Sequence, residues 1–256
     1  MSFFEKLKEF KNAVYGKNYT CYLCRAEVFD GACFCEDCAE RLRYNLRYCE
    51  RCGRIIPQRG YCASCRSRAP VYDRARSVFV YEGYARDAVL RFKTGEPWLA
   101  KAFVEEGMPV IERELMPFDL IVPVPMLAAD KRQRGYNQAE LLAEEISART
   151  GVETRNLFRK VKKTLGQKEL TAAERRENLR GAFRLQRGAD LKGKTVLLAD
   201  DAMTTGTTAE TLCGMLRAAG AEKVLVFTVA SIDYGAARNN FAKRSQNDLT
   251  PDIKEE

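Results

Sequence analysis

The sequence predicts an α/β protein, with a parallel sheet and flanking helices, preceded by a small cysteine-rich module. From about residue 75 onward, short continuous apolar runs alternate with amphipathic stretches, as in parallel sheets covered on both faces. Before that point, nine of the ten cysteines crowd between residues 21 and 65. A chain of 256 residues with 46% hydrophobic and 30% charged residues can bury a core of this kind.

The module contains four Cys-x-x-Cys pairs in tandem, and this spacing is typical of structural zinc. Two such pairs complete a tetrahedral four-cysteine site, and metal binding supplies folding energy to a segment too small for its own core. We expect a zinc-ribbon module over 19–70 with the ligands Cys21, Cys24, Cys35, Cys38, Cys49, Cys52, Cys62 and Cys65. The simplest pairing joins the first four and the last four; interleaved pairing and a redox or disulfide set are the alternatives. Cys33 is surplus.

Ten arginines and only two acidic residues lie between residues 41 and 76, with Tyr44, Tyr48, Tyr61 and Tyr72 interleaved. A nucleic-acid base can stack on an aromatic ring or on a guanidinium plane. Contact with single-stranded nucleic acid is therefore one interpretation of this segment. The other is a set of solvated arginines around a zinc module.

The rest of the chain predicts strands and helices in alternation. Asn137 with Glu140 resembles a capping box, and Gly151 and Gly220 stop their helices. The expected elements, in order, are a strand at 77–81, helices at 83–92 and 98–114, a strand at 119–125, a helix from Asn137 to Gly151, a strand at 195–201, a helix up to Gly220 and a strand at 223–230.

Composition excludes several chemistries and favours anionic partners. The chain has no histidine, so it has no Ser-His-Asp triad, no HExxH zinc site and no haem held by a proximal histidine. Its 43 Lys and Arg against 35 Asp and Glu give a net charge of +8, which favours phosphates or nucleic acid as partners.

The chain shows no targeting or membrane signal. Residues 2–15 interrupt each short apolar stretch with Lys or Glu, unlike a signal peptide, and no run of about 18 apolar residues occurs. We therefore predict a cytoplasmic protein without membrane insertion, an N-terminal helix over 1–18 and a flexible tail over 236–256. The lone Cys213 lies among core positions of its helix and is expected to be a buried thiol.

Two segments resemble phosphate-binding loops, and the context rejects one of them. Residues 188–195 satisfy the Walker A pattern, but they run directly into a strand, whereas a P-loop must open a helix. We expect a turn there. The second segment does run from strand through loop to helix, and it comprises Asp200, Asp201, Ala202, Met203, Thr204, Thr205, Gly206, Thr207 and Thr208.

The second segment has the chemistry to hold a ribose 5-phosphate. Its threonine hydroxyls, Gly206 and successive backbone amides at a helix start form an anion cradle. Asp200 and Asp201 repel each other at the dry end of a strand, and a vicinal diol would satisfy both. The alternative is a helix cap after a strand, without a ligand.

This segment resembles the phosphoribosyltransferase signature, although Ala199 and Ala202 are smaller than usual there. The resemblance extends to Val122–Pro125, to Arg134–Ala143, to Gln167, Leu170 and Glu174–Phe183, and to the cysteine pairs. Together these are similar to the ComF family over about residues 20–233. That family implies a type I phosphoribosyltransferase fold, a Rossmann-like parallel sheet with flanking helices, here over 71–235, behind a zinc module. Its competence members act in the cytoplasm on single-stranded DNA during natural transformation.

The resemblance also implies a ligand and further site residues. Phosphoribosyl pyrophosphate (PRPP) would bind with Mg²⁺, and Asp200 and Asp201 would be the catalytic pair. Lys131, Arg132 and Arg134 would share the pyrophosphate charge, unless they form only a solvated basic turn. A mobile basic loop would close over the site or follow a DNA backbone, and it would contain Lys162, Lys163, Gln167, Arg175 and Arg176.

No pattern in the sequence identifies an acceptor, so turnover stays open. The alternative function is a non-catalytic adaptor that keeps the fold and binds single-stranded DNA or docks on a helicase or translocase of DNA uptake.

Overall fold

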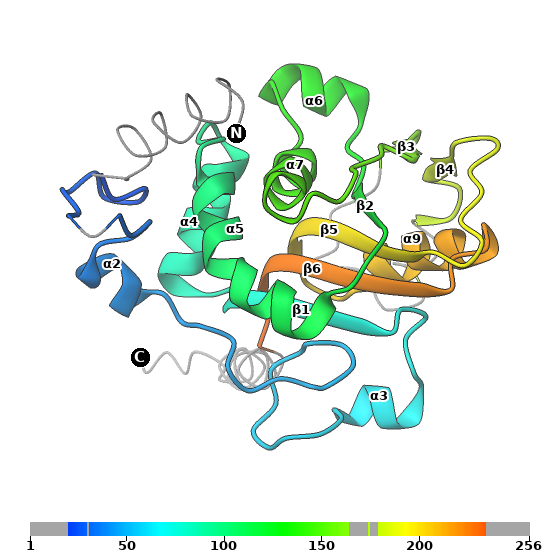
Figure 1. The fold of residues 1–256 in the computed structure, drawn as a ribbon, viewed down its shortest axis with the longest axis horizontal. Helices are drawn as coiled ribbons and strands as arrows, with labels where there is room; N and C mark the ends of the chain where they lie inside the picture. Colours follow the sequence, from blue (N-terminus) through cyan, green and yellow to red (C-terminus); the bar gives the residue numbers. More distant parts are fainter. Residues whose placement is uncertain (1–19, 30, 164–173, 175–178, 234–256) are drawn as a thin grey trace, which may run out of the picture.

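The computed structural model describes residues 20–29, 31–163, 174 and 179–233 (Figure 1). The predicted N-terminal helix over 1–18 and the tail over 236–256 lie outside them. A four-stranded sheet forms the centre, in the order β1-β6-β5-β2 with all neighbours parallel. The strands are β1 (Arg74–Val80), β2 (Leu120–Pro123), β5 (Thr195–Met203) and β6 (Lys223–Ser231). The predicted parallel sheet is confirmed.

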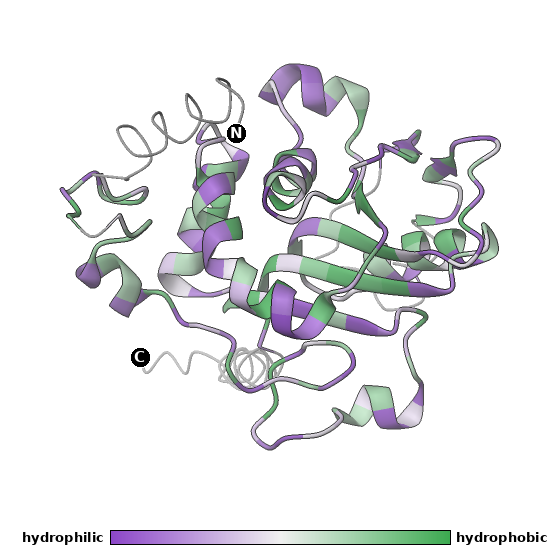
Figure 2. Cartoon of the chain, viewed as in Figure 1, coloured by the Kyte–Doolittle hydropathy of each residue, from purple (hydrophilic) through white to green (hydrophobic). Residues whose placement is uncertain are grey.

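Helices cover both faces of this sheet because its side chains alternate between two cores. Leu197 and Phe227 point to the face covered by α4 (Gly83–Lys93), α5 (Leu99–Val110) and α7 (Gln138–Thr150). Leu198 and Val226 point to the opposite face, which packs on α9 (Thr207–Ala218). Figure 2 shows the central strands as mostly hydrophobic, while the helices carry hydrophilic residues on their outer turns.

Most of the predicted helix ends agree with the structure. Gly151 ends α7 in a left-handed conformation with φ of +73°, and Asn137 Oδ1 accepts a hydrogen bond from Ala139 N at 3.2 Å. The predicted capping box is wrong in its second half, because the Glu140 carboxylate pairs with Lys131 and does not return to the Asn137 amide. The expected helix over 98–114 consists of α5 followed by a π-helical turn, Ile111–Leu115.

Several short elements were not predicted. They are α2 (Glu36–Arg41), α3 (Ala63–Ser67), α6 (Ala128–Arg134) and a ribbon of two antiparallel strands, β3 (Phe158–Lys160) and β4 (Phe183–Leu185). These pieces are too short and too polar for a periodic signal; α6, for example, is largely hydrophilic (Figure 2). The segment with a Walker A pattern is a turn that leads straight into β5, as predicted.

The cysteine module packs on both faces of the sheet and covers its β1 edge. Cys21 and Cys38 belong to the core under α4, whereas Cys49 and Cys52 belong to the core under α9. The chain between them runs along β1, where Ala75 N donates to Arg51 O at 2.7 Å and Asn45 N donates to Val78 O at 2.8 Å. An edge strand that would otherwise be open is thereby paired.

This packing predicts a large cost for a methyl group at Gly53. An alanine Cβ there would lie 2.4 Å from the Ala75 carbonyl oxygen, in a backbone with φ of +65°. We expect Gly53→Ala to lower the free energy of unfolding by about 2–5 kcal/mol, measured by denaturant titration. Gly193→Ala is the control, because its φ is +70° with nothing within 4 Å, and it should cost only about 1–2 kcal/mol. Equal losses in the two variants would show that the contact with β1 is unimportant.

Candidate functional site

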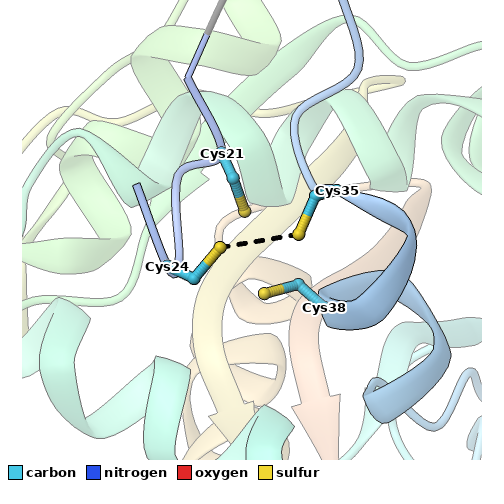
Figure 3. Close-up of side chains that lie close together, drawn as sticks. All are labelled: Cys21, Cys24, Cys35 and Cys38. Carbon is cyan, nitrogen blue, oxygen red and sulfur yellow. Dashed lines mark hydrogen bonds between the residues drawn. The ribbon is translucent and has the colours of Figure 1, made fainter. Parts of the chain in front are cut away.

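The first four cysteines converge on one point. Figure 3 shows the sulfur atoms of Cys21, Cys24, Cys35 and Cys38 facing one another, with Cys24 Sγ 3.5 Å from Cys35 Sγ. All four lie within 4.8 Å of one another. Burial raises the pKa of the Cys21 thiol, but backbone amides, including those of Cys24 and Cys35, outweigh it and lower the pKa to about 6. The thiolate, which is the form that binds metal, is therefore favoured there.

The last four cysteines form a second group of the same kind. Cys49, Cys52, Cys62 and Cys65 are buried and also lie within 4.8 Å of one another, with Cys52 Sγ 3.7 Å from Cys62 Sγ. Tetrahedral zinc with bonds of about 2.3 Å places its sulfur ligands about 3.8 Å apart. Both groups fit a structural zinc ion, and the grouping follows the sequence order without interleaving.

The remaining thiols lie outside these groups. None of the ten cysteines forms a disulfide. Cys33 is buried, and burial followed by the charges of Glu105 and Glu106 raises its pKa to about 11. Cys213 is fully buried and its pKa is also raised by burial, as expected for a core thiol.

A second site lies at the carboxyl end of β5, where two carboxylates stand side by side. Asp200 Oδ1 accepts a hydrogen bond from Asp201 N at 2.9 Å. Burial, and then the negative charge of Asp201, raises the pKa of Asp200 to about 7. Near neutral pH this carboxyl group is therefore balanced between its two protonation states, which makes it responsive to a ligand that donates hydrogen bonds.

Lys93 compensates part of this charge, and sequence reasoning missed it. Its Nζ lies 3.0 Å from Asp201 Oδ1, and the Asp201 side chain is 13% exposed. Although burial lowers the pKa of Lys93, the charges of Asp201 and Asp200 raise it above the ordinary value. One signal was present: Lys93 continues the row of buried Ala85 and Val89 at intervals of four residues along α4, where a lone cation is unusual.

The segment Met203–Thr208 connects β5 to α9 and includes the first two residues of that helix; it is called the Thr loop. Gly206 stands at the N-cap with φ of +78°, and Thr205 Oγ1 lies 2.9 Å from Thr207 Oγ1. The first N–H groups of a helix have no partner within it, so they face whatever occupies the loop. A cavity of about 30 Å³ lies there, lined by Asp200, Ala202, residues 203–209 and four side chains of the sheet and of the end of β2.

The predicted pyrophosphate-side residues lie on α6. β2 ends beside the carboxylate pair, because Val124 N donates to Ala199 O at 2.9 Å, and α6 begins four residues later. On this helix Lys131 pairs with Glu140, and Arg134 donates to Gln138 Oε1 at 2.6 Å, while Arg132 is exposed. None of the three lines the small cavity of the Thr loop.

Only part of the predicted basic loop can be placed. Lys162 and Lys163 are exposed and follow β3, whereas Gln167, Arg175 and Arg176 lie outside the described residues. Lys160, the last residue of β3, lies close enough to act on the site. It forms a parallel bridge with Leu127, and its positive charge favours the ionised form of Asp200.

The tyrosines between residues 41 and 76 have mostly structural roles. Tyr72 is 5% exposed, and the hydroxyls of Tyr44 and Tyr48 donate to Glu106 at 2.7 Å and to Glu114 at 2.9 Å. Arg76 is also buried: it stacks on Tyr48 and pairs with Glu114 at 2.7 Å. Among these tyrosines, Tyr61 keeps an exposed ring, with Arg51 over it.

Comparison with family models agrees with this architecture. Residues 10–66 match the model described as a double zinc ribbon domain, and residues 133–250 match the phosphoribosyl transferase domain. The chain is thus a phosphoribosyltransferase-domain protein with an N-terminal double zinc ribbon. Together with the cysteine groups, the ribbon supports structural zinc. Within the described residues, no helix is long and apolar enough to span a bilayer.

Named relatives confirm the resemblance to the ComF family. The chain is 28% identical over 225 residues to "Competence protein F" of Haemophilus influenzae, covering 83% of this chain and 97% of that one. It is 26% identical over 216 residues to "DNA utilization protein YhgH" of Escherichia coli K12, covering 81% and 94%. It is 24% identical over 183 residues to "Competence protein ComFC" of Bacillus subtilis, covering 68% and 73%. The protein is a homologue of these competence and DNA-utilization proteins.

Solved structures give distant matches. Glutamine PRPP amidotransferase from B. subtilis matches with 23% identity and a TM-score of 0.36, over 52% of this chain and 26% of that one. Adenine phosphoribosyltransferase from Saccharomyces cerevisiae matches with 20% identity and a TM-score of 0.35, over 55% and 70%.

The cysteine groups predict two zinc ions per chain. Cys24→Ser, in the first group, and Cys62→Ser, in the second, should each reduce the zinc content of purified protein from two to one, measured by mass spectrometry of metals. Each should also lower the midpoint of thermal unfolding, because metal binding contributes folding energy. Cys213→Ser is the control, since its thiol lies outside both groups, and it should keep both ions. Metal-free protein with paired cysteines would contradict the assignment.

Proposed function

We propose that the protein binds PRPP with Mg²⁺ at the carboxyl end of β5. The observation that supports this most directly is that Asp200 and the Thr loop line one cavity, with Asp201 next to Asp200 at the end of the same strand. A phosphate monoester suits the amides at the start of α9, and a ribose diol suits the two carboxylates. The two groups are joined in a ribose 5-phosphate.

In this proposal Asp200 and Asp201 accept hydrogen bonds from the ribose hydroxyls. Donation by a diol offsets the repulsion between the two carboxylates and favours ionised Asp200. Lys93 holds Asp201 in place through its ion pair and keeps the pair from carrying its full negative charge. These residues orient the ribose so that its C1 faces away from the Thr loop.

The pyrophosphate end lies toward the loop after β2 in the same proposal. Exposed Arg132 and the neighbouring Lys131 and Arg134 supply positive charge on α6, with Lys162 and Lys163 after β3. Mg²⁺, when bound with the ligand, neutralises pyrophosphate oxygens.

The names of the relatives suggest the process that this site serves. We infer a role in the handling of single-stranded DNA in the cytoplasm during uptake or utilization of DNA. Arg47, Arg59, Arg66 and Arg68 are exposed on the zinc ribbon without an acidic partner among the described residues, which favours contact with a phosphodiester backbone. If the protein is instead an adaptor without PRPP, these arginines would contact DNA or a helicase or translocase alone.

The double variant Asp200→Asn with Asp201→Asn separates the two functions. We expect its affinity for PRPP, measured by calorimetry with Mg²⁺, to decrease by at least about 100-fold. A neutral amide accepts a weaker hydrogen bond from a ribose hydroxyl than a charged carboxylate does. Zinc content and binding of single-stranded DNA should stay unchanged.

The matched control for this experiment is Asp87→Asn, which removes an exposed carboxylate on α4 that does not line the cavity of the Thr loop. It should bind PRPP like the unaltered protein. Equal PRPP affinity in the double variant and the unaltered protein would show that the ribose does not bind to these carboxylates. Absence of PRPP binding in both would favour the adaptor.

The raised pKa of Asp200 gives the site a pH dependence. Without ligand, a carboxyl with a pKa of about 7 is mostly protonated at pH 6 and mostly ionised at pH 8. Because the ribose diol binds the ionised form, the Asp200 contribution to PRPP affinity should increase about tenfold from pH 6 to pH 8. Carbon NMR of the carboxyl groups should show Asp200 titrating near pH 7 alone and below pH 6 with PRPP. In Asp201→Asn the pKa should decrease only in part, because burial is its larger cause. Titration near pH 4 in the unliganded protein would contradict this account.

A further inference from the structure

The Thr loop has a second side, which faces the zinc ribbon. A cleft of about 470 Å³ separates it from the second cysteine group, lined by Arg54, Arg68, Thr205 and Thr207 among others. A smaller adjoining cavity brings Cys52, Arg54 and Tyr72 to the same loop, at Met203–Gly206. The loop that cradles the phosphate is therefore shared between the sheet and the ribbon.

The hydroxyl of Tyr72 lies at this junction. Its side chain is 5% exposed, and its oxygen lies 3.8 Å from the position that a Cβ on Gly206 would take. No hydrogen bond joins the hydroxyl to another described residue, although it lines both ribbon-side cavities. Because Tyr72 lines these cavities, its hydroxyl can donate a hydrogen bond to an anion held in the Thr loop.

Arg54 brings positive charge to the same place. Its Nη1 donates to Ser64 Oγ at 3.3 Å, and its backbone oxygen accepts from Cys49 N at 2.7 Å, a bond within the second cysteine group. Gly53, packed on the Ala75 carbonyl, fixes the chain just before it. Glu210, the acidic residue in the cleft, already accepts a hydrogen bond from Val71 N at 3.1 Å.

We propose that Arg54 and Tyr72 bind the phosphate in the Thr loop from the ribbon side, so that the second cysteine group positions part of the ligand site. The inference rests on the proposed PRPP site and adds to it two residues of the segment that precedes the sheet. The first cysteine group has no such role: its near neighbour is Tyr84, with Cys38 Sγ 3.2 Å from the Tyr84 hydroxyl, and the cavities around the Thr loop include none of its residues.

Calorimetry with PRPP and Mg²⁺ tests the two side chains separately from the fold. Arg54→Gln should weaken binding about tenfold or more and Tyr72→Phe about threefold to tenfold, because each removes one hydrogen-bond donor to a charged phosphate. Arg54→Lys should recover part of the affinity, since it restores the charge. Arg86→Gln, at an exposed arginine of α4 that lines neither cavity, is the matched control and should leave the affinity unchanged.

Ribose 5-phosphate is the second probe, because it shares only the 5-phosphate and the ribose with PRPP. Arg54→Gln should weaken binding of both ligands by the same factor, while zinc content and the thermal midpoint stay at the values of the Arg86→Gln control. A purely structural role would change the midpoint and not the affinity.

Each outcome decides between the proposals. PRPP binding that is equal in Arg54→Gln, Tyr72→Phe and the control would overturn this inference and leave the proposed function standing. Loss of PRPP affinity without loss of ribose 5-phosphate affinity would place Arg54 away from the 5-phosphate and also overturn it. If the unaltered protein binds neither ligand, both the proposed function and this inference are wrong.

Discussion

The position of β5 between two parallel neighbours is the constraint on which the site depends. β2 and β6 are hydrogen-bonded to it on either side, so that Leu197 lies level with Ile121 and Leu225. Because all three strands run the same way, they end at one edge of the sheet, and the chain that leaves each of them enters the same region. The adjacent carboxylates of Asp200 and Asp201, the Thr loop and the loop toward α6 meet there as a consequence.

The carboxylate pair leaves negative charge at that edge that is only partly compensated. Burial, and then the repulsion of the neighbouring Asp201, raises the pKa of Asp200 to about 7, and Lys93 offsets only part of the charge. The start of α9 adds a local excess of positive potential a few residues later. In the proposed binding mode, a ligand with a diol at one end and a phosphate at the other complements both features, and the zinc ribbon, which packs on both faces of the sheet, contributes further donors.

The sequence predicted what depends on neighbours along the chain. Strand runs, the Gly151 stop, the turn before Thr195 and the grouping of cysteines by order follow from local spacing, and the structure agrees with them. Lys93 could not be assigned, because its partner Asp201 is more than a hundred residues away and only the fold brings them together. The tyrosines of the ribbon suggested stacking platforms, but most are used for packing and for hydrogen bonds to Glu106 and Glu114 on helices that local patterns do not place beside them.

A crystal structure of the protein grown with PRPP and Mg²⁺ would test the central claim most directly. The account predicts the 5-phosphate within hydrogen-bond distance of the amides of the Thr loop and the ribose hydroxyls on Asp200 and Asp201. Ligand bound elsewhere on the chain, or an unchanged loop without ligand at saturating concentration, would contradict it.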